Sequence, residues 1–512
     1  MGKFITLITL LFSFHLMAQP QGGPPNFCTK DLETFPTRSG GRIKPLYVLA
    51  TDTIKFITGE SKVGDLSATE AFCKLSLKAF GMPIELPVMV RVDHVDVKKA
   101  LNMKDGDHSI PVNEALEKAG VLENEMAEIK ENNSYKKELT KVKQRLDAYS
   151  AIVGARLWTI PHVVNDKVEF MALGEFLTET RVSEVRTKTD NPVGYLFDQA
   201  KADYLKVNGD GYLLELTYFK FNPFLWAMLL SLVGILLFVG LKNKTAGTVV
   251  TVLSIAIQIA AMTMRVMISG RAPVTNMYET VMFSGFGALV ISCIITLMRK
   301  EIIFVIAGLS FNVLTLMMMK FANGMLDPGI SPLVPVLRDN FWLSTHVTTV
   351  ILSYAALALS WLIANGLMLR DRFSTVSSAE YRYGVDLVYT CIKFGVVLLS
   401  AGVILGGVWA DYSWGRFWGW DPKETWSLIV LLVYMAILHG KSTSWIPNHR
   451  FIPLVAGAFM SVMMAWFGVN YILASGLHSY GFSEGGAVFL GSFFLIQIAV
   501  LVLGTVKSKK TA

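Results

Sequence analysis

Cysteine is scarce in this chain, which has 4 cysteines among 512 residues, and no two of them have the CxxC spacing. A thiol–disulfide exchange motif and a cysteine-rich zinc site are therefore not supported. Cys293 and Cys391 lie in apolar segments and are expected to be core residues. Cys28 and Cys73 lie in the polar first part of the chain, where a disulfide and two free thiols are both open alternatives.

Charged residues are also few, at 17% of the chain, whereas 52% of the residues are hydrophobic. A soluble protein of this length is ordinarily less apolar. The formal net charge of +7 comes from basic residues that do not cluster on one polar region. Membrane topology explains this charge better than nucleic-acid binding does, so we expect a membrane protein without a nucleic-acid partner.

The first residues have the pattern of a secretory signal. Lys3 precedes an apolar run from Phe4 to Met17, and Ala18 stands at a plausible cleavage position. The run is short for a membrane span, so residues 1–19 are interpreted as a signal peptide. Leu16 is not a small residue, and an uncleaved anchor is the alternative.

Residues 20–220 are predicted to form a soluble extracytoplasmic domain of mixed, mainly helical structure. Apolar residues recur at helical spacing within residues 112–149, with a break at residues 132–134, and residues 88–92 are predicted to be extended. The histidines of this region lack metal-ligand spacing, and surface or core roles are expected for His94, His108 and His162.

From residue 221 onward, apolar runs of about twenty residues predict transmembrane helices. The predicted spans are residues 223–241, 248–269, 278–298, 302–319, 342–369, 385–408, 426–440, 451–474 and 486–505. The expected fold is therefore an all-α polytopic membrane protein with about nine transmembrane helices and an N-terminal extracytoplasmic domain. If the signal peptide places residue 20 outside, most basic residues of the loops lie inside, as the positive-inside rule requires. The predicted inside ends carry Lys242, Lys244, Arg299, Lys300, Arg370, Arg372, Arg382, Lys441, Arg450, Lys507, Lys509 and Lys510, against Arg271, Lys320, Arg338, Arg416 and Lys423 outside.

Tryptophan is concentrated in one predicted outer segment, residues 409–426, which has the sequence WADYSWGRFWGWDPKETW. The segment also contains glycines and charged residues of both signs. An aromatic belt at a membrane surface supplies one or two rings at a helix end, and this segment is richer than that. A flat, aromatic and partly charged surface suits a large planar ligand with a few charges, and haem is such a ligand.

Three histidines of the membrane half are candidate haem ligands, because histidine inside a membrane is costly and usually functional. His346 lies at the predicted outer start of the fifth span, and His478 lies in the outer loop between spans eight and nine. Two imidazoles on one side of the membrane can form an axial pair for haem iron. His439 lies thirteen residues beyond Trp426, roughly 20 Å along the helix at about 1.5 Å per residue. It is either a snorkelling side chain beside Lys441 or a ligand that another chain completes.

These residues resemble the CcsA (ResC) family of system II cytochrome c biogenesis, within the haem-handling superfamily named for its WWD motif. The similar residues include 414–426, Ala272–Glu279, the surroundings of His346, and Gly476–Tyr480, so that the resemblance covers roughly residues 270–485. Phe417 stands where the family commonly has another aromatic residue. Arg42–Leu46 is similar to the N-terminal part of longer members, without a role that the residues explain.

The resemblance implies a role for each matching residue. His346 and His478 are expected to ligate haem on the external side, and His439 to receive haem inside the membrane with a ligand from a ResB (CcsB) partner. The WWD segment is expected to be the haem platform, formed by Trp414, Gly415, Arg416, Trp418, Gly419, Trp420, Asp421, Pro422, Lys423, Glu424 and Trp426. Arg416 and Lys423 are candidates for the haem propionates, and Asp421 for orienting a loop amide or an incoming substrate.

The resemblance therefore predicts a haem-delivery and attachment subunit of a system II cytochrome c synthase in a bacterial inner membrane. The expected cargo is haem b, and the expected partners are a ResB-like membrane protein, apocytochrome c with a CxxCH motif, and a thiol-reducing thioredoxin-like protein. No metal is expected other than haem iron. The alternatives are a b-haem electron-transfer subunit of a quinol-linked complex, which needs paired histidines within the bundle, and a transporter for another planar molecule.

Overall fold

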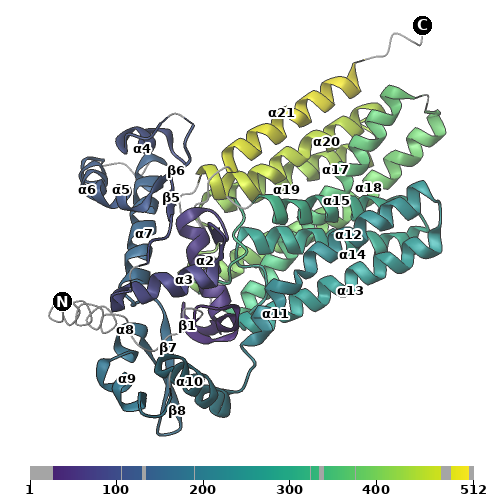
Figure 1. Cartoon of the computed structure of the whole chain (residues 1–512). Helices are drawn as coiled ribbons and strands as arrows, with labels where there is room; N and C mark the ends of the chain where they lie inside the picture. The colour runs from purple at the N-terminus through teal and green to yellow at the C-terminus, as the bar shows by residue number, and fades with distance from the viewer. Residues whose placement is uncertain are drawn as a thin grey trace, which may run out of the picture. The chain divides into compact units, whose positions relative to one another are not determined.

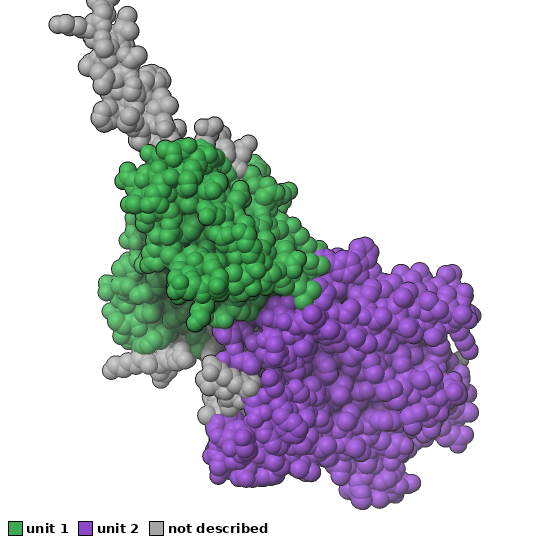
Figure 2. Space-filling view, turned by 90° about the horizontal axis from the view of Figure 1, so that it is seen from below, with its two compact units in different colours: residues 1–220 green, residues 221–512 purple. Residues whose placement is uncertain are grey.

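The computed structural model describes residues 27–506 apart from residues 83, 105, 130–133, 190, 323–324, 334–338, 375 and 474–485. The chain divides into two compact units, Met1–Lys220 and Phe221–Ala512, which Figure 2 draws in separate colours. Each unit is described below by itself. The predicted signal peptide, residues 1–19, lies outside the described residues.

The first unit combines short helices with four two-stranded antiparallel sheets, which pair β1 with β2, β3 with β4, β5 with β6 and β7 with β8 (Figure 1). Its core is a cluster of buried side chains that includes Trp158, Phe72 and Phe197. The elements are η1 (Lys30–Thr34), β1 (Pro36–Ser39), β2 (Arg42–Pro45), α2 (Leu46–Thr58), β3 (Lys62–Val63), β4 (Leu66–Ser67), α3 (Ala68–Leu77), η2 (Lys78–Phe80), β5 (Met89–Arg91), α4 (Val95–Ala100), β6 (Ser109–Pro111), α5 (Val112–Glu117), α6 (Ala119–Glu128), α7 (Ser134–Val153), β7 (Thr159–Val164), β8 (Lys167–Ala172), α8 (Leu173–Phe176), α9 (Glu179–Val185), α10 (Pro192–Asn208) and α11 (Leu213–Phe221).

The mixed, mainly helical character predicted for this unit is confirmed. The extended segment predicted at residues 88–92 is present as β5, and residues 112–149 are mostly helical in α5, α6 and α7. Cys28 and Cys73 form a disulfide with a Cα–Cα distance of 5.6 Å, which decides between the two alternatives that the sequence left open. Cys73 is fully buried on α3, so the disulfide ties the start of the described chain to the core of the unit.

The second unit is an all-α bundle whose long helices run side by side (Figure 1). Within the described residues, nine helices are long and apolar enough to cross a bilayer, in agreement with the predicted polytopic fold. The elements are α12 (Pro223–Ile235), η3 (Leu236–Gly240), α13 (Lys244–Ser269), α14 (Met277–Arg299), α15 (Ile303–Phe321), α16 (Asn340–Trp342), η5 (Leu343–Val347), α17 (Thr348–Phe373), α18 (Ser378–Trp414), α19 (Pro422–Ser442), α20 (Asn448–Met463), η6 (Met464–Leu473) and α21 (Gly486–Thr505). The first span, Leu213–Gly240, begins in α11 and continues through α12 and η3.

Helix α17 occupies the middle of this bundle, because it packs against α14, α18, α20 and α21. Its neighbours alternate in direction, so the start of α17 lies beside the start of α14, the end of α18 and the end of η6. Two of the three π-helical segments found among the described residues of the unit, η5 and η6, lie at this end of the bundle. π-Helical turns inside α-helices are frequently found at functional sites. A functional site is therefore expected at this end of the second unit.

Candidate functional site

A cavity opens at this end of the second unit and contains about 1150 Å³ of empty space, including its opening to solvent. Small-molecule sites are usually concave and mostly apolar, with few polar groups. The lining comes from six helical elements (α14, η5, α17, α18, α19 and η6), the turn between α13 and α14, and the loop between α18 and α19. It consists of Val274, Thr275, Asn276, Met277, Thr280, Leu343, His346, Val347, Val350, Ile351, Tyr354, Val403, Gly406, Gly407, Trp409, Phe417, Trp418, Lys423, Glu424, Ser427, Ala465, Trp466 and Asn470.

His346 is the histidine that lines this cavity, and it lies half-buried in the π-helical segment η5. Its Nδ1 atom lies 2.9 Å from the backbone oxygen of Gly402 on α18. A carbonyl oxygen can only accept, so Nδ1 carries the proton and donates it. The lone pair of the neutral ring is then on Nε2, which is the tautomer that a metal ligand at Nε2 requires.

Two neighbouring glycines of α18 make room for the rings of the site. A Cβ atom added at Gly406 would lie 2.6 Å from Cε1 of His346, and one added at Gly407 would lie 2.5 Å from the Phe417 ring. Real Cβ atoms do not approach other atoms so closely, so any other residue at these positions would displace the imidazole or the phenyl ring. The centroid of the Trp409 ring, also on α18, lies 5.6 Å from that of the His346 ring.

The tryptophan-rich segment is divided between two helices and a short loop. Helix α18 continues as far as Trp414, where Gly415 ends it in the left-handed conformation with φ +67°, and α19 begins at Pro422. Only residues 415–421 therefore connect the helices, although the sequence pattern suggested a longer loop between the spans. Trp418 and Phe417 of this loop line the cavity together with Trp409 of α18.

Trp420 is directed differently from Trp418. It is 70% exposed, its ring meets the Trp418 ring edge to face at 6.0 Å, and its φ is +57°. A bulky residue in the left-handed region is a genuine outlier, and such strain collects at functional sites. Trp414 and Trp426 are half-buried and lie outside the cavity lining.

The acidic residues of the segment hold the loop and the start of α19. The Asp421 side chain accepts from the backbone N–H groups of Lys423 and Glu424, at 2.8 and 3.4 Å. Glu424 accepts in return from the backbone N–H of Asp421 at 3.2 Å and from that of Gly419 at 2.7 Å. This is a capping box with Pro422 at the first helical position, a strong helix-start arrangement. Asp421 thus orients backbone amides, one of the two roles considered for it.

The two basic residues of the segment are placed differently. Lys423 lines the cavity, whereas Arg416 is exposed and its guanidinium group lies against the backbone of Gly419.

His439 lies in the last turn of α19, seventeen residues from Pro422 and so about 26 Å along the helix from the cavity end. Its side chain is exposed, on the same face of α19 as Leu432 and Met435. His478 lies outside the described residues.

The structure adds residues that sequence reasoning did not assign to the site. Gly406 and Gly407 lie within a predicted span, and only the packing of α17 and η5 on α18 brings them to His346; Trp409, the first residue of the predicted tryptophan-rich segment, joins them on α18. Thr280, Trp466 and Asn470 join the lining from α14 and η6. Trp466 donates its indole N–H to the Thr280 hydroxyl at 3.1 Å, which fixes η6 against α14. A sequence signal existed for the 272–279 segment, whose similarity to the family extends to the cavity wall.

Comparison with known proteins assigns this unit to a family. The sequence profile of the family described as "Cytochrome C assembly protein" matches residues 274–478, which contain every residue of the cavity lining. The chain is 33% identical over 251 residues to "Cytochrome c biogenesis protein CcsA" of Prochlorococcus marinus (strain NATL1A), covering 42% of this chain and 78% of that protein. The chain belongs to the CcsA family.

Two further relatives show how much of this chain the similarity covers. A CcsA protein of Synechococcus sp. (strain CC9311) is 31% identical over 300 residues, which cover 51% of this chain and 97% of that protein. "Protein NrfI" of Wolinella succinogenes is 32% identical over 265 residues, which cover 49% of this chain but 28% of that protein. Membership in the CcsA family gives the chain a role in cytochrome c biogenesis in a membrane, which involves handling haem and apocytochrome c.

Proposed function

We propose that the chain is the haem-delivery and attachment subunit of a system II cytochrome c synthase. The observation that carries the proposal is the imidazole of His346. It lines an aromatic cavity next to the WWD segment, and its Nδ1–H is held by the Gly402 carbonyl, so that the lone pair is on Nε2. The chemistry of the lining suits a haem b cargo: ring faces, a nitrogen ligand and a lysine.

Each part of the site has a task in this proposal. His346 binds the iron at one axial position, and His478 is the proposed second ligand. Trp409, Phe417 and Trp418 offer apolar ring surface to the macrocycle, and Lys423 is the proposed partner of a propionate. Of the two basic residues considered for the propionates, Arg416 is the less suited because it does not line the cavity.

Attachment needs positioning more than acid–base chemistry. Each thioether forms when a cysteine S–H of CxxCH adds across a haem vinyl group, so a C–S bond forms, the proton moves to the neighbouring vinyl carbon, and nothing leaves. Holding the haem edge and the two thiols together supplies the main rate advantage. The thiols must be reduced beforehand, for which we propose a thioredoxin-like protein. The histidine of the CxxCH motif then replaces one external ligand and releases the product.

The exposed side chain of His439 supports a membrane partner. An ionisable side chain that faces lipid from a spanning helix is costly, and such residues normally pair with another group. His439 shares its exposed face of α19 with apolar side chains, so a second membrane protein can cover all of them. We propose a ResB-like protein there, with a ligand that completes a haem site at His439 before the haem reaches the external cavity.

The proposed location is a bacterial inner membrane with the first unit and the cavity on the extracytoplasmic side. The Cys28–Cys73 disulfide supports this orientation, because disulfides persist in oxidising compartments. The distribution of lysine and arginine between the loops supports it independently.

The test is a haem spectrum combined with a maturation assay in cells. Purified with its ResB-like partner, the protein should show the absorption spectrum of bis-imidazole haem. His346→Ala should reduce the retained haem and the yield of cytochrome c by at least about tenfold, the effect usual for a lost metal ligand or its support. His449→Ala is the control, since His449 is exposed at the start of α20 and away from the cavity. Full maturation by His346→Ala/His478→Ala would refute the proposal.

A further inference from the structure

A fully buried ion pair joins α13 and α14 beside the cavity. Nε of Arg265 lies 2.7 Å from Oε1 of Glu279, and the two side chains are 0% and 1% exposed. Both residues lie within candidate spans. Charged groups in such surroundings are expensive and are kept where they have a function. The proposed haem chemistry does not use either residue directly.

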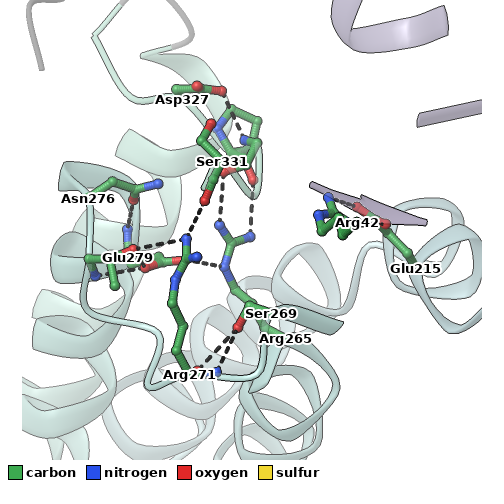
Figure 3. A network of polar contacts seen from close by, with 12 residues as sticks. Arg42, Glu215, Arg265, Ser269, Arg271, Asn276, Glu279, Asp327 and Ser331 are labelled. Atoms are coloured by element: carbon green, nitrogen blue, oxygen red, sulfur yellow. Dashed lines mark hydrogen bonds and ion pairs between the residues drawn. The ribbon is translucent and has the colours of Figure 1, made fainter. Parts of the chain in front are cut away.

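Glu279 holds the turn that forms one wall of the cavity. Its second oxygen, Oε2, accepts from the backbone N–H of Thr275 at 2.7 Å and from the Thr275 hydroxyl at 2.6 Å. Its own backbone N–H donates to the Asn276 side chain at 2.8 Å (Figure 3). Thr275 and Asn276 line the cavity. Val274 beside them is buried against Leu343 of η5 (Leu343–Val347), the His346 segment. The carboxylate therefore fixes the wall that faces His346.

The Arg265 side chain that pairs with Glu279 also holds a second segment, residues 325–331. Its Nη1 and Nη2 atoms donate to the backbone oxygens of Pro328 and Gly329, at 3.0 and 3.3 Å. Arg271 also donates a hydrogen bond to this segment, from Nη2 to the backbone oxygen of Ser331 at 2.6 Å (Figure 3). At the other end of this segment, the Tyr471 hydroxyl of η6 donates to the Met325 oxygen at 2.8 Å. One arginine thus connects α13 to a segment that also contacts η6.

We propose that Arg265 and Glu279 are positioning residues of the haem site. They hold the 271–276 turn against the His346 segment, and the 325–331 segment against η6, without touching the cargo. The assignment rests on the proposed function for the identity of the cargo. Arginine suits this place because its planar group donates to a carboxylate and to two carbonyls at once, which the single ammonium of lysine does not.

If the Arg265–Glu279 ion pair only stabilised the fold, a different effect of its removal on haem binding would be expected. Replacing both charges of a buried pair by apolar side chains of similar volume is often neutral for stability, whereas removing one partner leaves an unpaired buried charge. Arg265→Met/Glu279→Leu therefore removes the contacts to Thr275, Pro328 and Gly329 without leaving a charge behind. If the pair only stabilises, this variant retains haem as the wild type does.

The experiment compares retained haem with thermal stability in the complex with the ResB-like partner. We expect the double variant and Glu279→Gln each to lose about 10-fold or more of the haem and to shift the absorption band of the remainder. Asp386→Asn is the matched control, because it removes an exposed ion pair with Arg299 at the other end of α14. Wild-type haem content in the folded double variant would overturn the proposal. If the double variant aggregates, Glu279→Gln carries the test.

Hydrogen exchange on the haem-free chain separates this inference from the proposed function. The Thr275 amide donates to Glu279, so residues 271–276 should exchange slowly in the wild type and at least about 10-fold faster in both variants. Unchanged exchange would overturn the positioning role whether or not haem binds. A wild type that binds no haem but shows the expected change in exchange would refute the proposed function and leave the positioning role of the pair intact.

Discussion

The orientation of the His346 imidazole depends on two groups that belong to another helix. The Gly402 carbonyl fixes which ring nitrogen carries the proton, and the missing side chain of Gly406 lets the ring lie against α18. Supporting groups of this kind usually affect a metal ligand nearly as strongly as the ligand's own removal does. The proposed role of His346 as an iron ligand thus depends on η5, which contains it, and on α18, which orients its ring.

Gly406→Ala should displace the His346 ring, because the added methyl group would lie 2.6 Å from Cε1. We expect about a 10-fold loss of retained haem with normal membrane insertion, measured by the absorption spectrum of the purified complex. Gly366→Ala on α17 is the control, since a Cβ atom added there meets nothing within 4 Å. Equal haem content in the two alanine variants would show that the close approach to Gly406 is not needed.

Residue types alone were sufficient to find part of the site. A histidine at a span end and a dense tryptophan segment are unusual enough to identify His346 and Trp418, and both line the cavity. Gly406 could not be found, because glycines are common in membrane helices and only the contact of α17 with α18 distinguishes this one. Arg265 did leave a signal, since an arginine within a predicted apolar span needs a partner. That Glu279 is the residue paired with Arg265 could be seen only from the packing of α13 against α14.

At the scale of elements, the loop from Gly415 to Asp421 is held mainly from the side of α19. The Asp421 and Glu424 carboxylates together accept from four backbone N–H groups, those of Gly419, Asp421, Lys423 and Glu424. This cap fixes the helix start and thereby the position of Trp418. It also accounts for the tolerated strain at Trp420, whose neighbours on both sides are held.

Asp421→Ala should release the cap, and a lost N-cap costs about 1 kcal/mol of stability. The loop should then loosen, with lower haem retention and faster hydrogen exchange at residues 415–421. Asp421→Ser keeps an oxygen that can accept from the same amides, so it should retain most of the wild-type behaviour. If serine and alanine are equally damaging, the carboxylate acts on the incoming substrate rather than on the helix start.

The helices themselves were the most predictable elements. A run of about twenty apolar residues is a physical requirement for crossing a bilayer, and all nine predicted runs lie largely within helices of the described structure. The ends were less predictable. Helix α18 extends from Ser378 to Trp414, beyond the predicted 385–408, because its polar and aromatic ends are helical without being apolar. The π-helical segments η5 and η6 could not be predicted, since they depend on how side chains pack at the cavity.

For the whole molecule, the two ends of the membrane unit differ in character. One end contains the cavity and its aromatic rings, whereas the other contains the exposed ion pairs Arg299–Asp386 and Arg370–Glu380. Basic residues gather on the cytoplasmic side of membrane proteins, so the proposed orientation places the ion pairs inside and the cavity outside. The disulfide of the first unit is typical of an oxidising compartment, which agrees with the proposed extracytoplasmic location of that unit.

Paired serine-to-cysteine variants before and after α19 can test this orientation. Ser413, in the last turn of α18, and Ser444, just beyond α19, are both exposed, and the 21 residues of α19 between them span about 32 Å, close to the thickness of a bilayer core. A membrane-impermeant maleimide should label Ser413→Cys in intact cells and Ser444→Cys only after permeabilisation. The wild type measures the background labelling, because Cys28 and Cys73 are paired, Cys391 is buried, and the free, partly buried Cys293 lies within the candidate span Met277–Arg299. Labelling in the opposite order would place the cavity on the cytoplasmic side, and a haem attachment site for exported cytochromes could not lie there.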